Sequence, residues 1–180
     1  MKTSCLLDMV NVYIRILCAV GLILSYYSYI VELKAEEDEN YVAMCDISEH
    51  ISCTKAFSSE YGRGFGIIGR IYGEDSFLNM PNSYFGIIFY SLNLSLSCTN
   101  KPTINRILFY CTLSSNMMSL YLAYILYFIL HDFCIVCVSI YVVNATLTYF
   151  TYNKLKLVKS GTGFDSDEST TTVSDHFKIS

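Results

Sequence analysis

Residues 130–150, LHDFCIVCVSIYVVNATLTYF, form a run apolar enough to lie in lipid. This run carries two cysteines three residues apart. A membrane-spanning helix needs about 20 predominantly apolar residues. The rest of the 180-residue chain has the same character, since 53% of the residues are hydrophobic and only 16% are charged. The sequence therefore predicts an all-α membrane protein.

Four apolar segments predict a bundle of four transmembrane helices, at about residues 12–31, 84–97, 107–130 and 133–152. The second segment reaches only about 21 Å of a roughly 30 Å hydrocarbon core, so a loop is expected to cap its outer end. The first segment is expected to stay as an anchor, because the sequence after it lacks the small residues of a signal cleavage site. Residues 1–159 form the predicted membrane redox domain, and the polar segment 160–180 is expected to be a disordered cytosolic tail.

The distribution of charge predicts the orientation in the membrane. The loop of residues 32–83 holds ten acidic and four basic residues. The opposite side of the predicted bundle collects seven basic residues: Lys2, Arg15, Lys101, Arg106, Lys154, Lys156 and Lys159. Because basic residues stay in the cytosol, both termini are predicted to be cytosolic and the large loop to be lumenal. Disulfides persist in such an oxidising compartment.

Four of the eight cysteines form two pairs that are suited to redox chemistry. Cys45 and Cys53 lie in the lumenal loop, and Cys134 and Cys137 form the CIVC motif. If Asp132 caps the fourth helix, Cys134 falls in the first turn, where the helix N-terminus favours a thiolate. Cys137 lies about one turn deeper. The two pairs predict an electron relay from an external dithiol through the loop to an apolar two-electron acceptor such as a quinone.

Other functions compete with this relay. Zinc bound by the four cysteines is conceivable, but seven residues separate the loop cysteines and metal ribbons prefer close pairs. A tetraspan scaffold would use the loop pair as a structural disulfide and leave CIVC without a role. A quinone-linked catalyst of disulfide formation would run the relay in the opposite direction. The GFGIIG match to a dinucleotide fingerprint fails, because the required acid about 20 residues later is replaced by Phe89 in a predicted span.

Two polar residues at membrane depth are candidates for substrate binding. Asn82 can donate its amide to a substrate carbonyl, and Tyr141, one turn beyond Cys137, can donate its hydroxyl to another oxygen. Each also has a structural alternative, a helix cap for Asn82 and an interhelical hydrogen bond for Tyr141. The small negative charge of −4 argues against a nucleic-acid partner.

Five segments, CDISEHISC, GRGFG, LNMPNSYFGIIFY, YLAYILYF and DFCIVC, resemble the animal vitamin K epoxide reductases in their order and spacing. The resemblance covers about residues 45–141 and the first span. It implies a four-helix bundle of the endoplasmic reticulum membrane that reduces vitamin K 2,3-epoxide to the quinone and the quinone to hydroquinone. Vitamin K is then the substrate, a dithiol is the external reductant, and no bound cofactor or metal is expected.

The resemblance also implies roles for individual residues. Cys137 attacks the substrate, and Cys134 resolves the adduct and receives electrons through Cys53. Cys45 takes them from a thioredoxin-like lumenal partner. Asn82 and Tyr141 bind the two naphthoquinone oxygens. Coumarin-type inhibitors are expected in the same apolar pocket, whose lining is formed by Phe57, Phe85, Phe89, Tyr90 and Leu122. One departure is Tyr61, which stands where the vertebrate enzymes have tryptophan.

Overall fold

The computed structural model describes residues 2–38, 40–48, 51–73 and 76–175, with side chains described among residues 5–160. These residues form helices and connecting loops, without a strand among them. The elements are α1 (Lys2–Glu37), α2 (Cys53–Phe57), the 3-10 turns η1 (Glu60–Gly62) and η2 (Gly64–Gly66), α3 (Ile68–Tyr72), α4 (Asn82–Ser97), α5 (Pro102–Tyr124), the π-helical turn η3 (Ile125–Ile129) and α6 (Ile135–Asp175). The prediction of an all-helical protein is confirmed.

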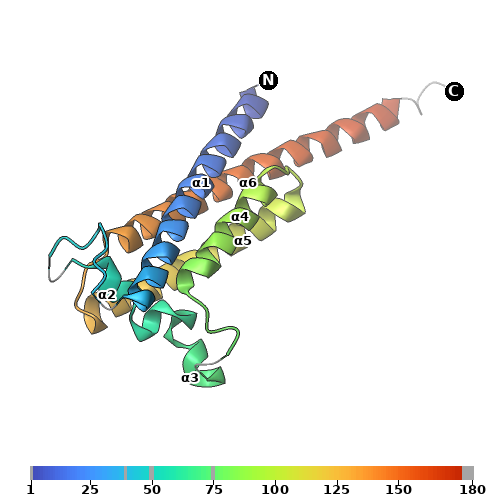
Figure 1. The fold of residues 1–180 in the computed structure, drawn as a ribbon. Helices are drawn as coiled ribbons and strands as arrows, with labels where there is room; N and C mark the ends of the chain where they lie inside the picture. Colours follow the sequence, from blue (N-terminus) through green and yellow to red (C-terminus); the bar gives the residue numbers. More distant parts are fainter. Residues whose placement is uncertain (1, 39, 49–50, 74–75, 176–180) are drawn as a thin grey trace.

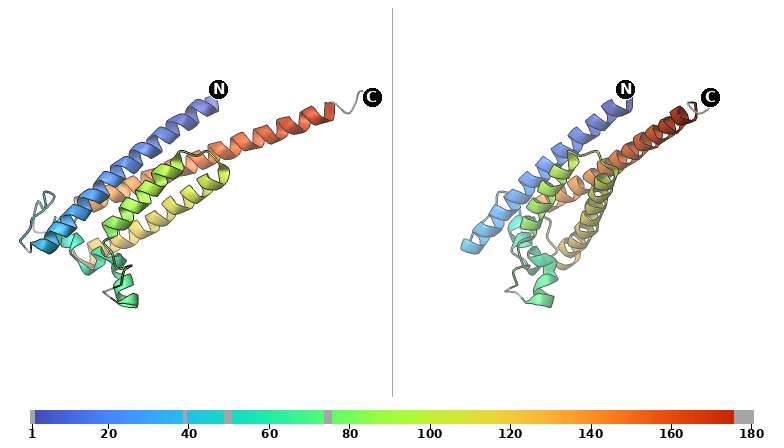
Figure 2. Two further views of the ribbon diagram at one scale, coloured as in Figure 1. Left: turned by 45° about the vertical axis from the view of Figure 1, so that its right-hand side comes forward. Right: turned by 90° about the vertical axis from the view of Figure 1, so that its right-hand side faces the viewer.

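The long helices α1, α4, α5 and α6 pack along one another, and the short elements gather at one end of them (Figure 1). α1 packs against α4 and α6, and α5 packs against α6. The beginning of α1 and the far end of α6 lie at the opposite end from α2 and α3 (Figure 2). The described part of the connection between α1 and α4 therefore covers one end of the helices.

Three helical segments of the described chain are long and apolar enough to cross a membrane: Cys5–Glu37, Pro102–Ile129 and Ile135–Ser160. The helix α4 has 16 residues. At 1.5 Å per residue it is about 24 Å long, shorter than the hydrocarbon core of a bilayer. A fourth crossing of the membrane by α4 remains a prediction.

The helices extend beyond most of the predicted spans. α1 continues to Glu37, so the start of the expected loop is helical, and α4 begins at Asn82 rather than at residue 84. α5 begins at Pro102, a residue suited to the first position of a helix. α6 begins at Ile135, two residues after the predicted start, and runs to Asp175. Disorder of the tail remains a prediction, and residues 176–180 lie outside the described chain.

Small residues bring α1 and α4 into close contact. A Cβ atom added to Gly86 would lie 2.6 Å from the Ser25 hydroxyl oxygen, and one added to Gly21 would collide with the Tyr90 ring. Glycine and serine at such positions let two membrane helices approach each other closely. This contact sets α4 against the outer half of α1.

Hydrogen bonds between side chains join α5 to α6. The hydroxyls of Thr112 and Thr151 lie 2.9 Å apart, and Asn116 Nδ2 donates to Thr148 Oγ1 at 2.5 Å. Lys154, fully buried on α6, donates from Nζ to the carbonyl oxygens of Ser97 at 2.7 Å and Thr99 at 3.1 Å. The ammonium group thus caps the C-terminus of α4, where a positive charge is favourable.

Candidate active site

A disulfide joins Cys45 and Cys53 in the loop, with Cα atoms 5.9 Å apart. Cys53 is the first residue of α2 and is buried, whereas Cys45 is half-buried. The side chain of Ser52 caps α2 by accepting a hydrogen bond from the Lys55 N–H. Among the described residues, Cys45, Asp46 and Cys53 form a group with metal-ligand spacing. The disulfide already occupies both sulfurs, so the geometry favours a disulfide over a metal site.

Asp46 holds the loop around this disulfide. Its carboxylate accepts hydrogen bonds from the backbone N–H groups of Ala43 at 3.0 Å, Cys53 at 2.6 Å and Thr54 at 3.1 Å. The Thr54 hydroxyl donates a fourth bond at 2.6 Å. Burial raises the pKa of Asp46, but these donors outweigh it and the pKa lies below its ordinary value. Asp46, in its ionised form, therefore fixes Cys53 at the start of α2.

Cys134 and Cys137 lie on either side of the start of α6 and are both unbridged. Cys134 is fully buried and precedes the helix, so the expectation that it lies in the first turn behind an Asp132 cap is wrong. Its own sulfur acts as the cap, accepting from the Cys137 N–H at 3.2 Å. Asp132 instead forms an ion pair with Lys55 at 3.8 Å. The chain leaves the helical path at His131, where φ is +53°.

The capping position favours a thiolate at Cys134. The Cys137 thiol and the N–H groups of Val136 and Cys137 donate to the Cys134 sulfur, and together they outweigh burial, so the pKa of Cys134 lies below its ordinary value. Cys53 and Cys134 belong to one buried cluster, and Cys45 and Cys137 pack against it. The four cysteines that the sequence singles out are thus gathered in one place, at the loop end of the long helices.

A cavity of about 410 Å³ opens beside this cluster. Residues of α1, α4, α5, α6 and the loop contribute to its walls. Cys137 and all seven residues predicted to contact substrate line it: Phe57, Asn82, Phe85, Phe89, Tyr90, Leu122 and Tyr141. Cys134, Cys45 and Cys53 do not line it. Cys137 is therefore the redox cysteine that faces the cavity, and Cys134 lies behind it.

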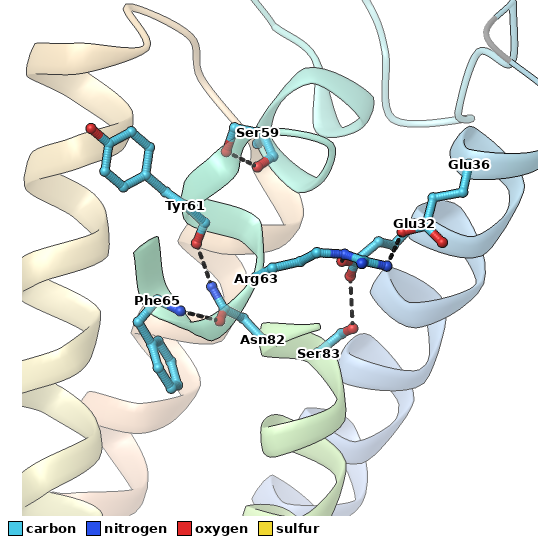
Figure 3. Close-up of polar contacts among 9 residues, drawn as sticks. Glu32, Glu36, Ser59, Tyr61, Arg63, Phe65, Asn82 and Ser83 are labelled. Carbon is cyan, nitrogen blue, oxygen red and sulfur yellow. Dashed lines mark hydrogen bonds and ion pairs between the residues drawn. The ribbon is translucent and has the colours of Figure 1, made fainter. Parts of the chain in front are cut away.

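A roof over the cavity is formed by residues 61–65 and held by Asn82 (Figure 3). Asn82 Nδ2 donates to the Tyr61 carbonyl at 2.6 Å, and Oδ1 accepts from the Phe65 N–H at 2.8 Å. Among the described residues, these two bonds leave the second amide hydrogen of Asn82 unused. Gly64, Phe65 and Gly66 have φ values of +50°, +58° and +68°. Gly64 and Gly66 thus let the backbone turn over the cavity.

Phe65 is a lining residue that the sequence analysis missed. Its ring lies 5.4 Å from the ring of Phe85 and forms part of the cavity wall. A left-handed conformation is unusual for phenylalanine, so tertiary contacts must hold it there. Its position between two glycines in GRGFG was the signal in the sequence, because glycine permits the neighbouring turns.

An ionic cluster on α1 also fastens the roof and was not foreseen (Figure 3). Glu32 is 3% exposed, lines the cavity and accepts from the Ser83 hydroxyl at 3.1 Å. Arg63 of the roof lies 3.7 Å from Glu32 and pairs directly with Glu36. The signal was present in the spacing, because acids four residues apart share one face of a helix. The charge pattern instead predicts that Glu32 and Glu36 lie in the lumenal loop of residues 32–83.

A polar network crosses the inner part of the cavity. Tyr90 donates its hydroxyl to Asn144 Oδ1 at 2.8 Å, and Asn144 Nδ2 donates to Ser119 Oγ at 2.9 Å. Tyr90 is therefore a structural link between α4 and α6 as well as a wall residue. The Tyr141 hydroxyl makes no hydrogen bond to another residue in the part of the chain that the structure describes, and Tyr141 lines the cavity.

Comparison with known proteins agrees with the gathered cysteines and the apolar cavity. A sequence profile of the vitamin K epoxide reductase family matches residues 12–152. The chain is 45% identical over 139 residues to the vitamin K epoxide reductase complex subunit 1 of mouse, covering 77% of this chain and 86% of the mouse protein. The rat protein of the same name is 44% identical over the same extent. The chain belongs to the vitamin K epoxide reductase family, a family of oxidoreductases.

Proposed function

We propose that this protein reduces vitamin K 2,3-epoxide to vitamin K quinone and the quinone to hydroquinone. The observation that carries the proposal is the placement of Cys137, which lines an apolar cavity while Cys134 lies directly behind it. An apolar cavity with a few convergent polar groups is suited to a ring with two carbonyl oxygens. The names of the mouse and rat relatives support the choice of substrate.

In this proposal the protein resides in the endoplasmic reticulum membrane as a four-helix bundle with both termini in the cytosol. α1, α5 and α6 supply three crossings, and α4 supplies the fourth with its outer end recessed beneath the loop. The bonds from Asn82 to the roof support this arrangement, since they satisfy an amide at membrane depth. The loop then faces the lumen, where a disulfide such as Cys45–Cys53 persists.

Epoxide reduction uses the two thiols of CIVC. The Cys137 sulfur attacks an epoxide carbon as its thiol gives up a proton, a C–S bond forms, the C–O bond breaks, and the opened oxygen takes that proton. The Cys134 thiolate then attacks Cys137 Sγ, which forms a disulfide and breaks the C–S bond. The electron pair left on the carbon expels the neighbouring hydroxyl group, which takes a second proton and leaves as water, and the quinone forms. Two electrons pass from the dithiol to the substrate. The hydrogen bonds that Cys134 accepts at the start of α6 support its action as a thiolate.

Substrate oxygens are held by Asn82 at the roof and by Tyr141 on α6. The free amide hydrogen of Asn82 and the unpaired hydroxyl of Tyr141 are suitable donors. The aromatic and aliphatic walls bind the ring system: Phe57, Phe85, Phe89, Tyr90 and Leu122. Coumarin-type inhibitors are expected to bind in the same cavity, next to Tyr61.

The loop pair returns the CIVC disulfide to the dithiol state. The Cys53 thiolate attacks Cys134, which releases the Cys137 thiolate, and Cys45 then attacks Cys53 and releases Cys134. A thioredoxin-like lumenal protein reduces the resulting Cys45–Cys53 disulfide. The disulfide and the shared cluster of both pairs support this order.

The test is turnover of vitamin K 2,3-epoxide by purified protein in detergent with dithiothreitol, beside the Cys137→Ala variant. Quinone production by the wild type alone is the expected result. If folded wild-type protein makes no quinone from the epoxide, yet its thiols are oxidised to a disulfide by added quinone, the proposal fails. In that case the protein is a quinone-linked catalyst of disulfide formation that runs the relay in the opposite direction. If folded wild-type protein neither converts the epoxide nor oxidises its thiols with quinone, the protein is instead a scaffold.

A further inference from the structure

Tyr27 of α1 contacts the loop disulfide. Its hydroxyl donates to Cys45 Sγ at an oxygen-to-sulfur distance of 3.6 Å. The backbone N–H groups of Met44 and Cys45 face the same phenol oxygen. Tyr27 also packs against the buried cluster that holds Cys53 and Cys134. The phenol is therefore held by helix α1 while its hydroxyl points at a sulfur of the loop disulfide.

Negative charge near the Cys45 sulfur means that a thiolate there needs a hydrogen-bond donor. The Asp46 carboxylate oxygen lies within 4.8 Å of the sulfurs of both Cys45 and Cys53. A nearby negative charge disfavours a second one, so Asp46 opposes formation of a thiolate at Cys45. Tyr41 also faces Tyr27, and Lys34 lies over the Tyr41 ring at 5.7 Å. Tyr27 is the side chain that donates a hydrogen bond to Cys45 among the described residues.

We propose that Tyr27 is a catalytic residue of the loop disulfide, whose hydroxyl stabilises the Cys45 thiolate each time the Cys45–Cys53 bond opens or closes. The inference rests on the proposed relay through this pair. It goes beyond that relay, because neither the resemblance to the family nor the two comparisons assigns a role to this tyrosine.

Both halves of the relay need this thiolate. When a thiolate of the protein partner attacks Cys45, a mixed disulfide forms and Cys53 leaves as a thiolate. The second partner thiol, once deprotonated, then attacks the partner sulfur, so that the partner becomes oxidised and Cys45 leaves as a thiolate that accepts the Tyr27 hydrogen bond. A thiol with a lower pKa is the better leaving group. In the return step, Cys45 as a thiolate attacks Cys53 and releases Cys134.

The first test measures the Cys45 thiol directly. In a Cys53→Ala background, which leaves Cys45 as a free thiol, alkylation of the Cys45 peptide by iodoacetamide is followed against pH by mass spectrometry. Tyr27→Phe is expected to move the midpoint upward by about one pH unit, and so to slow alkylation about ten-fold at neutral pH. Tyr26→Phe is the matched control, because Tyr26 is the neighbouring tyrosine and is 58% exposed.

The second test uses the full set of cysteines. With reduced thioredoxin as the reductant, Tyr27→Phe is expected to slow epoxide turnover several-fold more than it slows turnover with dithiothreitol, which reaches the inner pair directly. A midpoint for Cys45 equal to that of the Tyr26→Phe control would overturn the inference. An altered midpoint in a protein whose wild type reduces no epoxide would instead overturn the proposed function and leave Tyr27 as the partner of Cys45.

Discussion

At the scale of single residues, the site separates two cysteines by what each one faces. Cys137 faces the cavity, whereas Cys134 is fully buried behind it and takes hydrogen bonds at the start of α6. In the proposed mechanism, this difference gives contact with substrate to Cys137 and resolution of the adduct to Cys134. Cys45 and Cys53 do not line the cavity, so the effect of replacing either on turnover should depend on which reductant is supplied.

Cys137→Ala is predicted to abolish turnover with every reductant, because it removes the only CIVC thiol that lines the described cavity. Cys45→Ala is predicted to abolish turnover with reduced thioredoxin and to leave most of the turnover with dithiothreitol. The measurement is quinone formation by each variant with each reductant. Equal loss of both activities in Cys45→Ala would contradict the order of the relay.

Asn82→Asp is predicted to raise KM for the epoxide by roughly ten-fold or more, because it keeps the acceptor for the Phe65 N–H and removes the donor. An unsatisfied buried partner costs about 1 to 3 kcal/mol. The same change leaves the Tyr61 carbonyl unpaired, so the roof loosens. Ser91→Ala on the exposed side of α4 is the control. Unchanged kinetics in Asn82→Asp would limit Asn82 to holding the roof.

At the scale of elements, helix ends decide features that hydropathy does not reveal. The apolar pattern located α4 and α6 but placed the start of α6 two residues early, so Asp132 was taken as a cap in place of Cys134. A hydropathy pattern reports burial in lipid, whereas a helix begins where backbone donors find a cap. Lys154 shows the same limit, because a lysine near the end of a span reads as a cytosolic charge and here caps α4.

Lys154→Met is predicted to lower the stability of the bundle by about 1 to 3 kcal/mol, because it leaves the Ser97 and Thr99 carbonyls without their donor. The measurement is thermal unfolding in detergent, followed by loss of helical circular dichroism. Lys156→Met, at an exposed position on the same helix, is the control. A melting temperature equal to that of the control would contradict the capping role.

The loop around the disulfide is predicted to lose protection in acid. The folded pKa of Asp46 is lowered, so its contribution is present above the unfolded value of about 3.9 and is lost as pH falls through the folded pKa. Hydrogen exchange at the Cys53 and Thr54 amides should therefore accelerate, relative to the intrinsic rate, below about pH 4. In Asp46→Asn, these two amides should exchange faster at neutral pH, and their exchange rate relative to the intrinsic rate should change little further in acid. Identical profiles for the two proteins would contradict this account.

At the scale of the whole molecule, the sequence predicts the all-helical class, the four long helices and the gathering of the four cysteines. The cavity walls were predicted through resemblance, and all seven of those residues line it. Glu32, Phe65 and Asn144 were missed, because their partners lie far along the chain and no local pattern specifies which residues meet. The roof in particular depends on contacts between residues 61–65 and the distant Glu32 and Asn82.

The four crossings are tested by labelling with a membrane-impermeant maleimide in sealed microsomes. Cys98, exposed just after α4, is predicted to react from the cytosolic side. A Phe77→Cys variant, at an exposed loop position before α4, is predicted to react only after the membrane is permeabilised. Reaction of both positions in sealed microsomes would mean that α4 does not cross the membrane.

In the proposed mechanism, Cys137 forms a covalent bond with vitamin K 2,3-epoxide in the cavity. The most direct measurement is peptide mass spectrometry of a Cys134→Ser variant incubated with the epoxide, because removal of the resolving thiol leaves an adduct in place. The peptide carrying Cys137 is expected to gain the mass of the substrate. This gain is expected to disappear when Cys137 is also replaced by alanine. Modification of another cysteine, or an unmodified Cys137 in a variant that still produces quinone, would contradict it.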